Sequence, residues 1–146
     1  LAATLSERVA QLRTLAAAAA PLIPQLVAQQ RQRFLDRWNE ALGAEGGAAL
    51  ASSDMARDRA LAEATAYAIR IDVAEELTRL ASHLDEIDRL LSRGGEVGKR
   101  LDFLIQELHR EANTLGSKSS SLELTRISVD MKVLIEQMRE QVQNLE

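Results

Sequence analysis

The chain has 146 residues, of which 46% are hydrophobic and 27% charged, a balance typical of one folded domain and not of a disordered segment. Aromatic residues make up only 3%, and the net charge is −4, so neither an aromatic sheet that stacks RNA bases nor a globally basic nucleic-acid binder is expected. The absence of cysteine excludes disulfides, thiol catalysis and thiolate metal sites, and fits the reducing cytoplasm in which we expect the protein to lie.

The first 53 residues favour helix, with a break at two prolines. Apolar residues recur at helical spacing at Leu5, Val9 and Leu12, and an alanine run covers 16–20. Pro21 and Pro24 must then bend or break the helix. A further helical segment carries Phe34, Leu35, Trp38 and Leu42 and ends in the glycine-rich region 43–47, which we expect to be a loop. The longest apolar stretch, Leu15–Leu26, contains both prolines and is too short to span a bilayer, so no membrane partner is expected.

A second, much longer helix is predicted from about residue 54 to 92. Its apolar stripe is spaced three and four residues apart and consists of Ile69, Val73, Leu77, Leu80, Leu84, Ile87 and Leu91. Gly94 and Gly95 supply a C-terminal stop. A helix of about ten turns exceeds the ordinary globular length and indicates packing in a long hairpin or coiled-coil-like arm.

Two more amphipathic helices complete the chain. The stripe of the first, over about 97–115, is Leu101, Leu104, Ile105, Leu108, Ala112 and Leu115, and Gly116 is expected as its left-handed cap. A turn with an N-cap is expected at serines 119–121, and the last stripe is Ile127, Met131, Leu134, Met138, Val142 and Leu145. The expected fold is all-α, a long helical hairpin or bundle with near-heptad stripes, with a helical lead-in over 1–53 and a helical domain over 54–146.

Polar residues gather beside two of these stripes. On the long helix one flank carries Asp72, Glu76, Arg79, His83 and Glu86. The imidazole of His83 suits a metal ligand or a general acid/base, or else a satisfied polar residue at a helix interface. On the next helix Glu107 and Glu111 lie four residues apart, so their carboxylates repel each other unless a cation or Arg110 lies between them. The alternative to such a cation site is a solvated helix face with ordinary ion pairs. The phosphate-loop, dinucleotide, serine-hydrolase and zinc-protease motifs are absent from the sequence.

The C-terminal half also carries a dense resemblance to a known family. Residues 98–118 read GKRLDFLIQELHREANTLGSK, residues 133–146 read VLIEQMREQVQNLE, and residues 75–83 read EELTRLASH. These segments closely resemble the C-terminal signature of the bacterial YicC/YloC-type endoribonuclease family, and the resemblance is strong over about 70–146 and weaker before it. One departure is His109, where the family commonly has asparagine, which puts in doubt any role that needs an amide there.

The resemblance implies a metal-dependent endonuclease that acts on single-stranded RNA and assembles as a ring-like homo-oligomer, with a hexamer as the expected form. Family members carry a β-containing domain ahead of this region, so we expect a longer protein. RNA cleavage needs carboxylates for a divalent cation, Mn²⁺ or Mg²⁺, and cations for the phosphate. By matching position, the expected metal ligands are Glu76, Asp102, Glu107 and Glu111. The expected catalytic residues are His83, Glu107 and Glu111, and the expected phosphate-binding residues are Arg79, Arg100, Arg110, Lys118 and Arg139.

A competing interpretation assigns no chemistry to the chain. In it, the helices form an oligomerisation scaffold that holds RNA-binding domains in a ring, and the charged residues form ion pairs between subunits. A catalytic site should lose cleavage with a chelator and regain it with Mn²⁺ or Mg²⁺, whereas a scaffold should be indifferent. A coiled-coil adaptor unrelated to RNA would require the motif match to be accidental.

Overall fold

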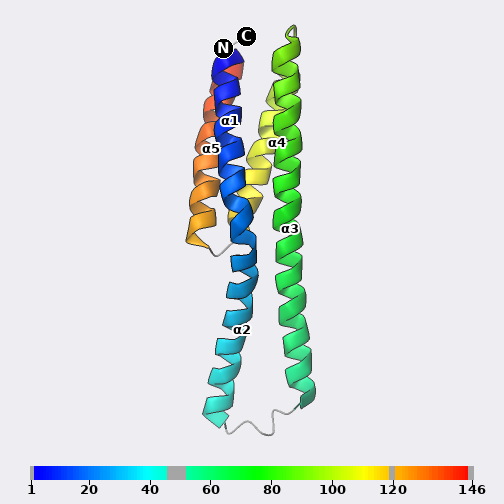
Figure 1. The fold of residues 1–146 in the computed structure, drawn as a ribbon, viewed down its shortest axis with the longest axis vertical. Helices are drawn as coiled ribbons and strands as arrows, with labels where there is room; N and C mark the ends of the chain where they lie inside the picture. The colour runs from blue at the N-terminus through cyan, green and yellow to red at the C-terminus, as the bar shows by residue number, and fades with distance from the viewer. Residues whose placement is uncertain (1, 46–51, 119–120, 145–146) are drawn as a thin grey trace.

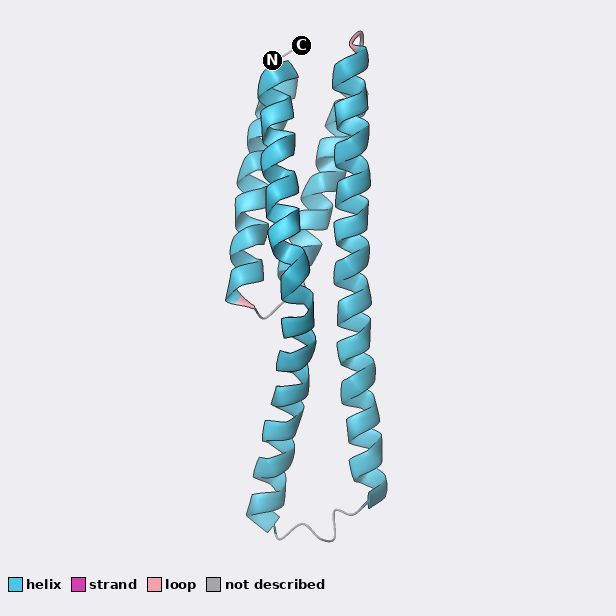
Figure 2. Ribbon diagram, in the orientation of Figure 1, coloured by secondary structure: helices cyan, strands magenta, loops and turns pink. Residues whose placement is uncertain are grey.

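The computed structural model describes residues 2–45, 52–118 and 121–144, and within them every regular element is a helix (Figures 1 and 2). The elements are α1 (Ala2–Ala19), a 3₁₀ turn η1 (Ala20–Leu22), α2 (Ile23–Glu45), α3 (Ser52–Arg93), α4 (Gly98–Ser117) and α5 (Leu122–Gln143). The all-α prediction is confirmed. Among the helices described, none is both long and apolar enough to cross a membrane.

The helices form two regions of different thickness. In Figure 1, α1, the C-terminal half of α3, α4 and α5 lie together, and α1 packs on α3 and α5 while α4 packs on α3 and α5. We call these four segments the bundle. The pair formed by α2 and the N-terminal half of α3 continues beyond the ends of α4 and α5. We call residues 27–45 and 52–71 the arm.

The core lies in the bundle and follows the predicted stripes. Its fully buried side chains include Leu5, Leu12, Leu80, Leu84, Ile87, Leu101, Leu104, Leu108, Leu115 and Met131. These residues recur every three or four positions, so each helix turns one apolar stripe inward and leaves its charged faces outside. A single apolar cluster contains side chains both from the predicted helical lead-in, residues 1–53, and from the predicted helical domain, residues 54–146.

The predicted interruptions are also present. The helical path tightens into η1 at Ala20–Leu22, with a proline at its start, because proline cannot donate the backbone hydrogen bond of a continuous helix. At the α3–α4 turn, Gly94 and Gly95 have φ of 70° and 86°, values that a side chain disfavours. Ser121 caps α5 by accepting a hydrogen bond from the Leu124 amide.

The expectation about Gly116 is wrong. Gly116 lies inside α4 and is not a left-handed cap; a Cβ there would lie 2.5 Å from the Ser128 hydroxyl, so this glycine permits close packing of α5.

The predicted stripe of α5 is confirmed at Met131, Met138 and Val142, which are buried, and Ile127 and Leu134 are partly buried against the core. The buried face is wider than predicted, since α1 and α4 both pack on this helix, and it also includes Leu124, Ser128 and Ile135. Leu145 lies outside the described residues.

Candidate functional site

A histidine and a carboxylate meet where α3 packs on α4. The Nδ1 atom of His83 lies 2.6 Å from the Oε1 atom of Glu111. The Glu111 side chain is 2% exposed and the His83 side chain 23% exposed. A hydrogen bond of this length to a buried carboxylate fixes the orientation of the ring.

The burial of Glu111 follows from its place on α4. It lies seven residues after Leu104, three after Leu108 and four before Leu115, so it belongs to the apolar stripe by spacing. The sequence analysis grouped Glu111 with Glu107, which lies four residues earlier but remains 27% exposed. The position of Glu111 within the leucine stripe is the sequence signal that distinguishes the two carboxylates.

Burial dominates the electrostatics of this pair. The pKa of Glu111 is raised, first because burial disfavours its charged form. The hydrogen bond and charge of His83 oppose this rise, whereas the negative charges of Glu107 and Glu76 add to it. Glu76 and Glu107 are therefore both close enough to Glu111 to disfavour its charged form.

These residues do not form a complete metal site. Among the residues that the structure describes, no group of three or more His, Cys, Asp or Glu side chains is arranged to hold a metal ion. The expected ligand Asp102 precedes Glu111 by nine residues, which turns it about 180° away around the helix. It accepts a hydrogen bond from Gln106 instead. Asp102 therefore lies on a different face of α4 from Glu111, and the choice of metal ligands among Glu76, Asp102, Glu107 and Glu111 stays a prediction.

Three of the five expected phosphate-binding residues lie on α3 and α4, and a fourth, Lys118, follows the last residue of α4. Arg79 contacts Glu76 at 3.0 Å, and Arg110 lies 3.8 Å from Glu107 with a side chain that is 77% exposed. No contact within the described chain joins Arg110 to Glu111, whose partner is His83. The fifth residue, Arg139, lies on α5, where it pairs with Glu136.

Two ion pairs fasten α3 to α4 on either side of the histidine. Arg100 contacts Glu86 at 2.7 Å, and Lys118 contacts Asp72 at 3.2 Å. Asp72, Glu86 and Arg100 lie on the helices predicted for them, whereas Lys118 follows both the predicted and the observed end of α4. The pairings themselves were not predicted, because helix register is a tertiary property. The two pairs hold the antiparallel register that brings His83 to Glu111.

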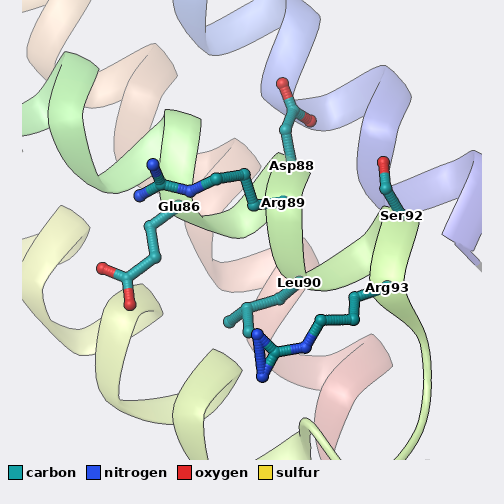
Figure 3. Close-up of a pocket in the computed structure, with 6 residues that line it drawn as sticks. All are labelled: Glu86, Asp88, Arg89, Leu90, Ser92 and Arg93. Carbon is teal, nitrogen blue, oxygen red and sulfur yellow. The ribbon is translucent and has the colours of Figure 1, made fainter.

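A hollow of about 630 Å³ beside Glu86 is not the candidate site. Figure 3 shows its lining residues at the C-terminal end of α3, with their polar groups pointing in different directions. Two of its carboxylates are already held in ion pairs, Glu86 by Arg100 of α4 and Asp88 by Arg13 of α1. A ligand would therefore meet no convergent set of free groups there.

Comparisons with known protein sequences identify the family of the chain. A sequence profile described as "Endoribonuclease YicC-like, C-terminal" matches residues 19–146. A protein of Haemophilus influenzae named probable endoribonuclease YicC is 46% identical over 124 residues, which are 85% of this chain and 40% of that protein. A protein of the same name from Clostridioides difficile is 39% identical over 89 residues, or 61% of this chain and 30% of that protein. The chain thus spans less than half the length of these relatives, and it belongs to the family of YicC-like endoribonuclease C-terminal domains.

Proposed function

We propose that the chain contributes the proton-transfer site of an endoribonuclease that cleaves single-stranded RNA, with His83 as the general acid/base. The observation that carries the proposal is the 2.6 Å contact between His83 Nδ1 and the buried Glu111. Within the described residues no hydrogen-bond partner occupies Nε2 of this ring. The names of the two relatives support the nuclease class.

The two ring nitrogens have different tasks in this proposal. A neutral imidazole that donates its Nδ1 proton to Glu111 keeps a lone pair on Nε2. Nε2 can then accept the proton of an attacking hydroxyl, and the resulting imidazolium can return a proton to the leaving oxygen of the phosphodiester. Glu111 stabilises the charged ring and holds its orientation, so it is a positioning residue.

Exposed cations beside the histidine suit the RNA backbone. Arg110 is the most available, because its side chain is 77% exposed and its contact with Glu107, at 3.8 Å, is long. Arg79 and Lys118 are about half exposed and could exchange their carboxylate contacts for a phosphate. Arg139 has no contact with this cluster within the described residues and is assigned to no step.

We also propose that cleavage requires a divalent cation, Mn²⁺ or Mg²⁺. The described residues do not fit a complete three-ligand site, and Nδ1 of His83 is already used by Glu111. The support for a cation is the concentration of negative charge, since Glu76 and Glu107 both raise the pKa of Glu111. These two carboxylates are the candidates for cation contact.

The test is cleavage of an end-labelled single-stranded RNA by the chain and by two matched variants. His83→Ala should lower the rate by about 10²- to 10⁴-fold, the usual contribution of a general acid/base. His109→Ala, on an exposed face of α4, should cleave like the wild type. Each protein is assayed with Mn²⁺, with Mg²⁺ and with chelator. Wild-type cleavage by His83→Ala would contradict the role of His83 as general acid/base. Cleavage that continues in the presence of chelator would contradict the proposed requirement for a divalent cation.

The scaffold function is retained as the second candidate because α5 keeps apolar side chains outside. Val129 is 51% exposed and Val133 52% exposed, and a groove of about 410 Å³ next to Val133 is lined from α1 and α5. Such a face favours association with another helix. A chain that forms a homo-oligomer, the hexamer expected from the family, yet never cleaves RNA would support the scaffold. Mass photometry and the cleavage assay separate the two outcomes.

A further inference from the structure

Most of the aromatic side chains of the protein lie on the arm. Of the four aromatic residues in the sequence, Phe34, Trp38 and Tyr67 lie on the arm. The rings of Phe34 and Trp38, one turn apart on α2, have centroids 6.1 Å apart and planes inclined by 23°. The low overall aromatic content therefore conceals a local cluster.

Open grooves flank the Phe34–Trp38 pair. One, of about 300 Å³, is lined by both rings together with Ala56 and Arg59. The other, of about 420 Å³, is lined by both rings together with Arg37, Leu61 and neighbouring residues of α2 and α3. Neither α4 nor α5 extends along the arm, so no described helix beyond α2 and α3 covers these grooves (Figure 1).

The charge of this surface suits an anionic ligand. Residues 30–38 and 56–65 contain five arginines and three carboxylates, whereas the whole chain has a net charge of −4. Arg31 is paired with Glu63 by two hydrogen bonds of 3.0 and 2.9 Å, which hold α2 against α3 at the aromatic pair. Arg37 and Arg59 have no ion pair within the described residues. The grooves thus combine π faces with available guanidinium groups.

The indole of Trp38 has an unused hydrogen-bond donor. Its Nε1 atom is buried and has no hydrogen-bond partner within the described chain. Buried indole N–H groups usually find an acceptor. A ligand with oxygen or nitrogen acceptors would satisfy it, whereas the apolar face of another helix would not.

We propose that the Phe34–Trp38 grooves bind unpaired bases of single-stranded RNA, with Arg37 and Arg59 at the adjacent phosphates. Stacking on aromatic side chains beside arginines is the general mode of single-strand recognition. The inference rests on the proposed function for the choice of RNA as the ligand. The site lies about 35 Å along α3 from His83, at about 1.5 Å per residue, so it anchors a distant part of the strand and takes no part in the chemistry.

The test uses Trp38 as its own probe, because it is the only tryptophan in the chain. We expect a single-stranded oligouridylate, added in the presence of chelator, to quench the Trp38 fluorescence in a saturable manner. Added salt should weaken this binding, since phosphate contacts release counterions. Duplex RNA of the same length, whose bases are already stacked, should quench much less.

Variants assign the binding to the grooves. Phe34→Ala should weaken the single-strand affinity about ten-fold, as expected for one lost stacking contact. Arg37→Glu changes only an exposed side chain, so it tests the site even if Phe34→Ala disturbs the arm. Arg89→Glu, an equal charge change on the exposed surface of the bundle, is the control and should leave the affinity unchanged (Figure 3).

The outcomes separate this inference from the nuclease proposal. Saturable quenching that Arg37→Glu weakens supports the arm site, even if the chain cleaves no RNA. Cleavage without quenching overturns the arm site and leaves the nuclease proposal intact. If Arg37→Glu changes the oligomeric state and leaves the RNA affinity unchanged, the proposed RNA site on the arm is also overturned, because the grooves would then hold a second copy of the chain.

Discussion

The bundle and the arm are built from the same kind of amphipathic helix, yet they bury very different amounts of side chain. In the bundle, Leu80, Leu84, Leu104 and Leu108 are fully buried between four helices. In the arm, only Ala66 is buried among the residues whose side chains are described. Two helices alone cannot enclose a core, because each retains an uncovered side.

This difference decides what each region can do. A carboxylate such as Glu111 can be isolated from water only where several helices meet, and there a hydrogen-bond contact of 2.6 Å holds the ring of His83. The arm cannot create such an environment, but it leaves Leu61 and Tyr67 about two-thirds exposed and able to meet a ligand. We therefore assign proton transfer to the bundle and strand binding to the arm.

The largest expected difference in stability concerns a leucine in each region. Leu108→Ala should lower the free energy of unfolding by about 2–5 kcal/mol, because the fully buried side chain leaves a cavity. Leu61→Ala, at a site 66% exposed, should change it by less than about 0.5 kcal/mol. Urea unfolding followed by circular dichroism gives both values. Equal losses at the two sites would remove the distinction between bundle and arm.

A smaller loss is expected where α4 and α5 approach most closely. Gly116→Ala places a methyl group 2.5 Å from the Ser128 hydroxyl, and overpacking of this kind costs about 1–3 kcal/mol. The helix propensity of alanine offsets about 1 kcal/mol of that cost. Because the methyl group added at position 116 would contact the Ser128 side chain, combining Gly116→Ala with Ser128→Ala should relieve part of the loss of stability in a double-mutant cycle. Strictly additive effects would refute the close approach.

The buried carboxylate should make stability depend on pH. The folded state holds the Glu111 proton more tightly than the unfolded state, since burial raises the pKa of this group. The free energy of unfolding should therefore decrease as pH rises from the ordinary glutamate pKa to the raised one. Glu111→Gln cannot ionise, so its stability should change less over this range. The control Glu96→Gln removes an exposed carboxylate outside this cluster and should keep the wild-type slope, and an unchanged slope in Glu111→Gln would contradict the assignment.

The smallest effect is expected at the ion pair that joins the two helices of the arm. Arg31 and Glu63 are each about half exposed, so Arg31→Ala should cost less than about 1 kcal/mol, and the cost should shrink in high salt. Thermal unfolding at two salt concentrations measures it. A loss larger than that of Gly116→Ala would mean that the arm depends on this pair more than its exposure suggests.

The sequence predicted the helices well because their signals are local. The stripe of α4, the proline break and the Gly94–Gly95 turn each depend on neighbouring residues and were confirmed. The burial of Ile135 in place of Leu134 was not predicted, since which face of α5 is covered depends on α1 and α4. The contact between His83 and Glu111, which are 28 residues apart in the chain, depends on the register of α3 against α4. The arm surface was missed because composition averages its aromatic residues over the whole chain.

The most direct test of the account is chemical rescue of His83→Ala. If His83 transfers the proton, removing its side chain abolishes RNA cleavage, and free imidazole added to the variant restores part of the rate in a saturable manner. A merely structural histidine would give a variant that imidazole does not rescue. The account predicts rescue in His83→Ala and no stimulation of the wild type by the same imidazole. Wild-type cleavage by His83→Ala without imidazole would contradict the central role given to this residue.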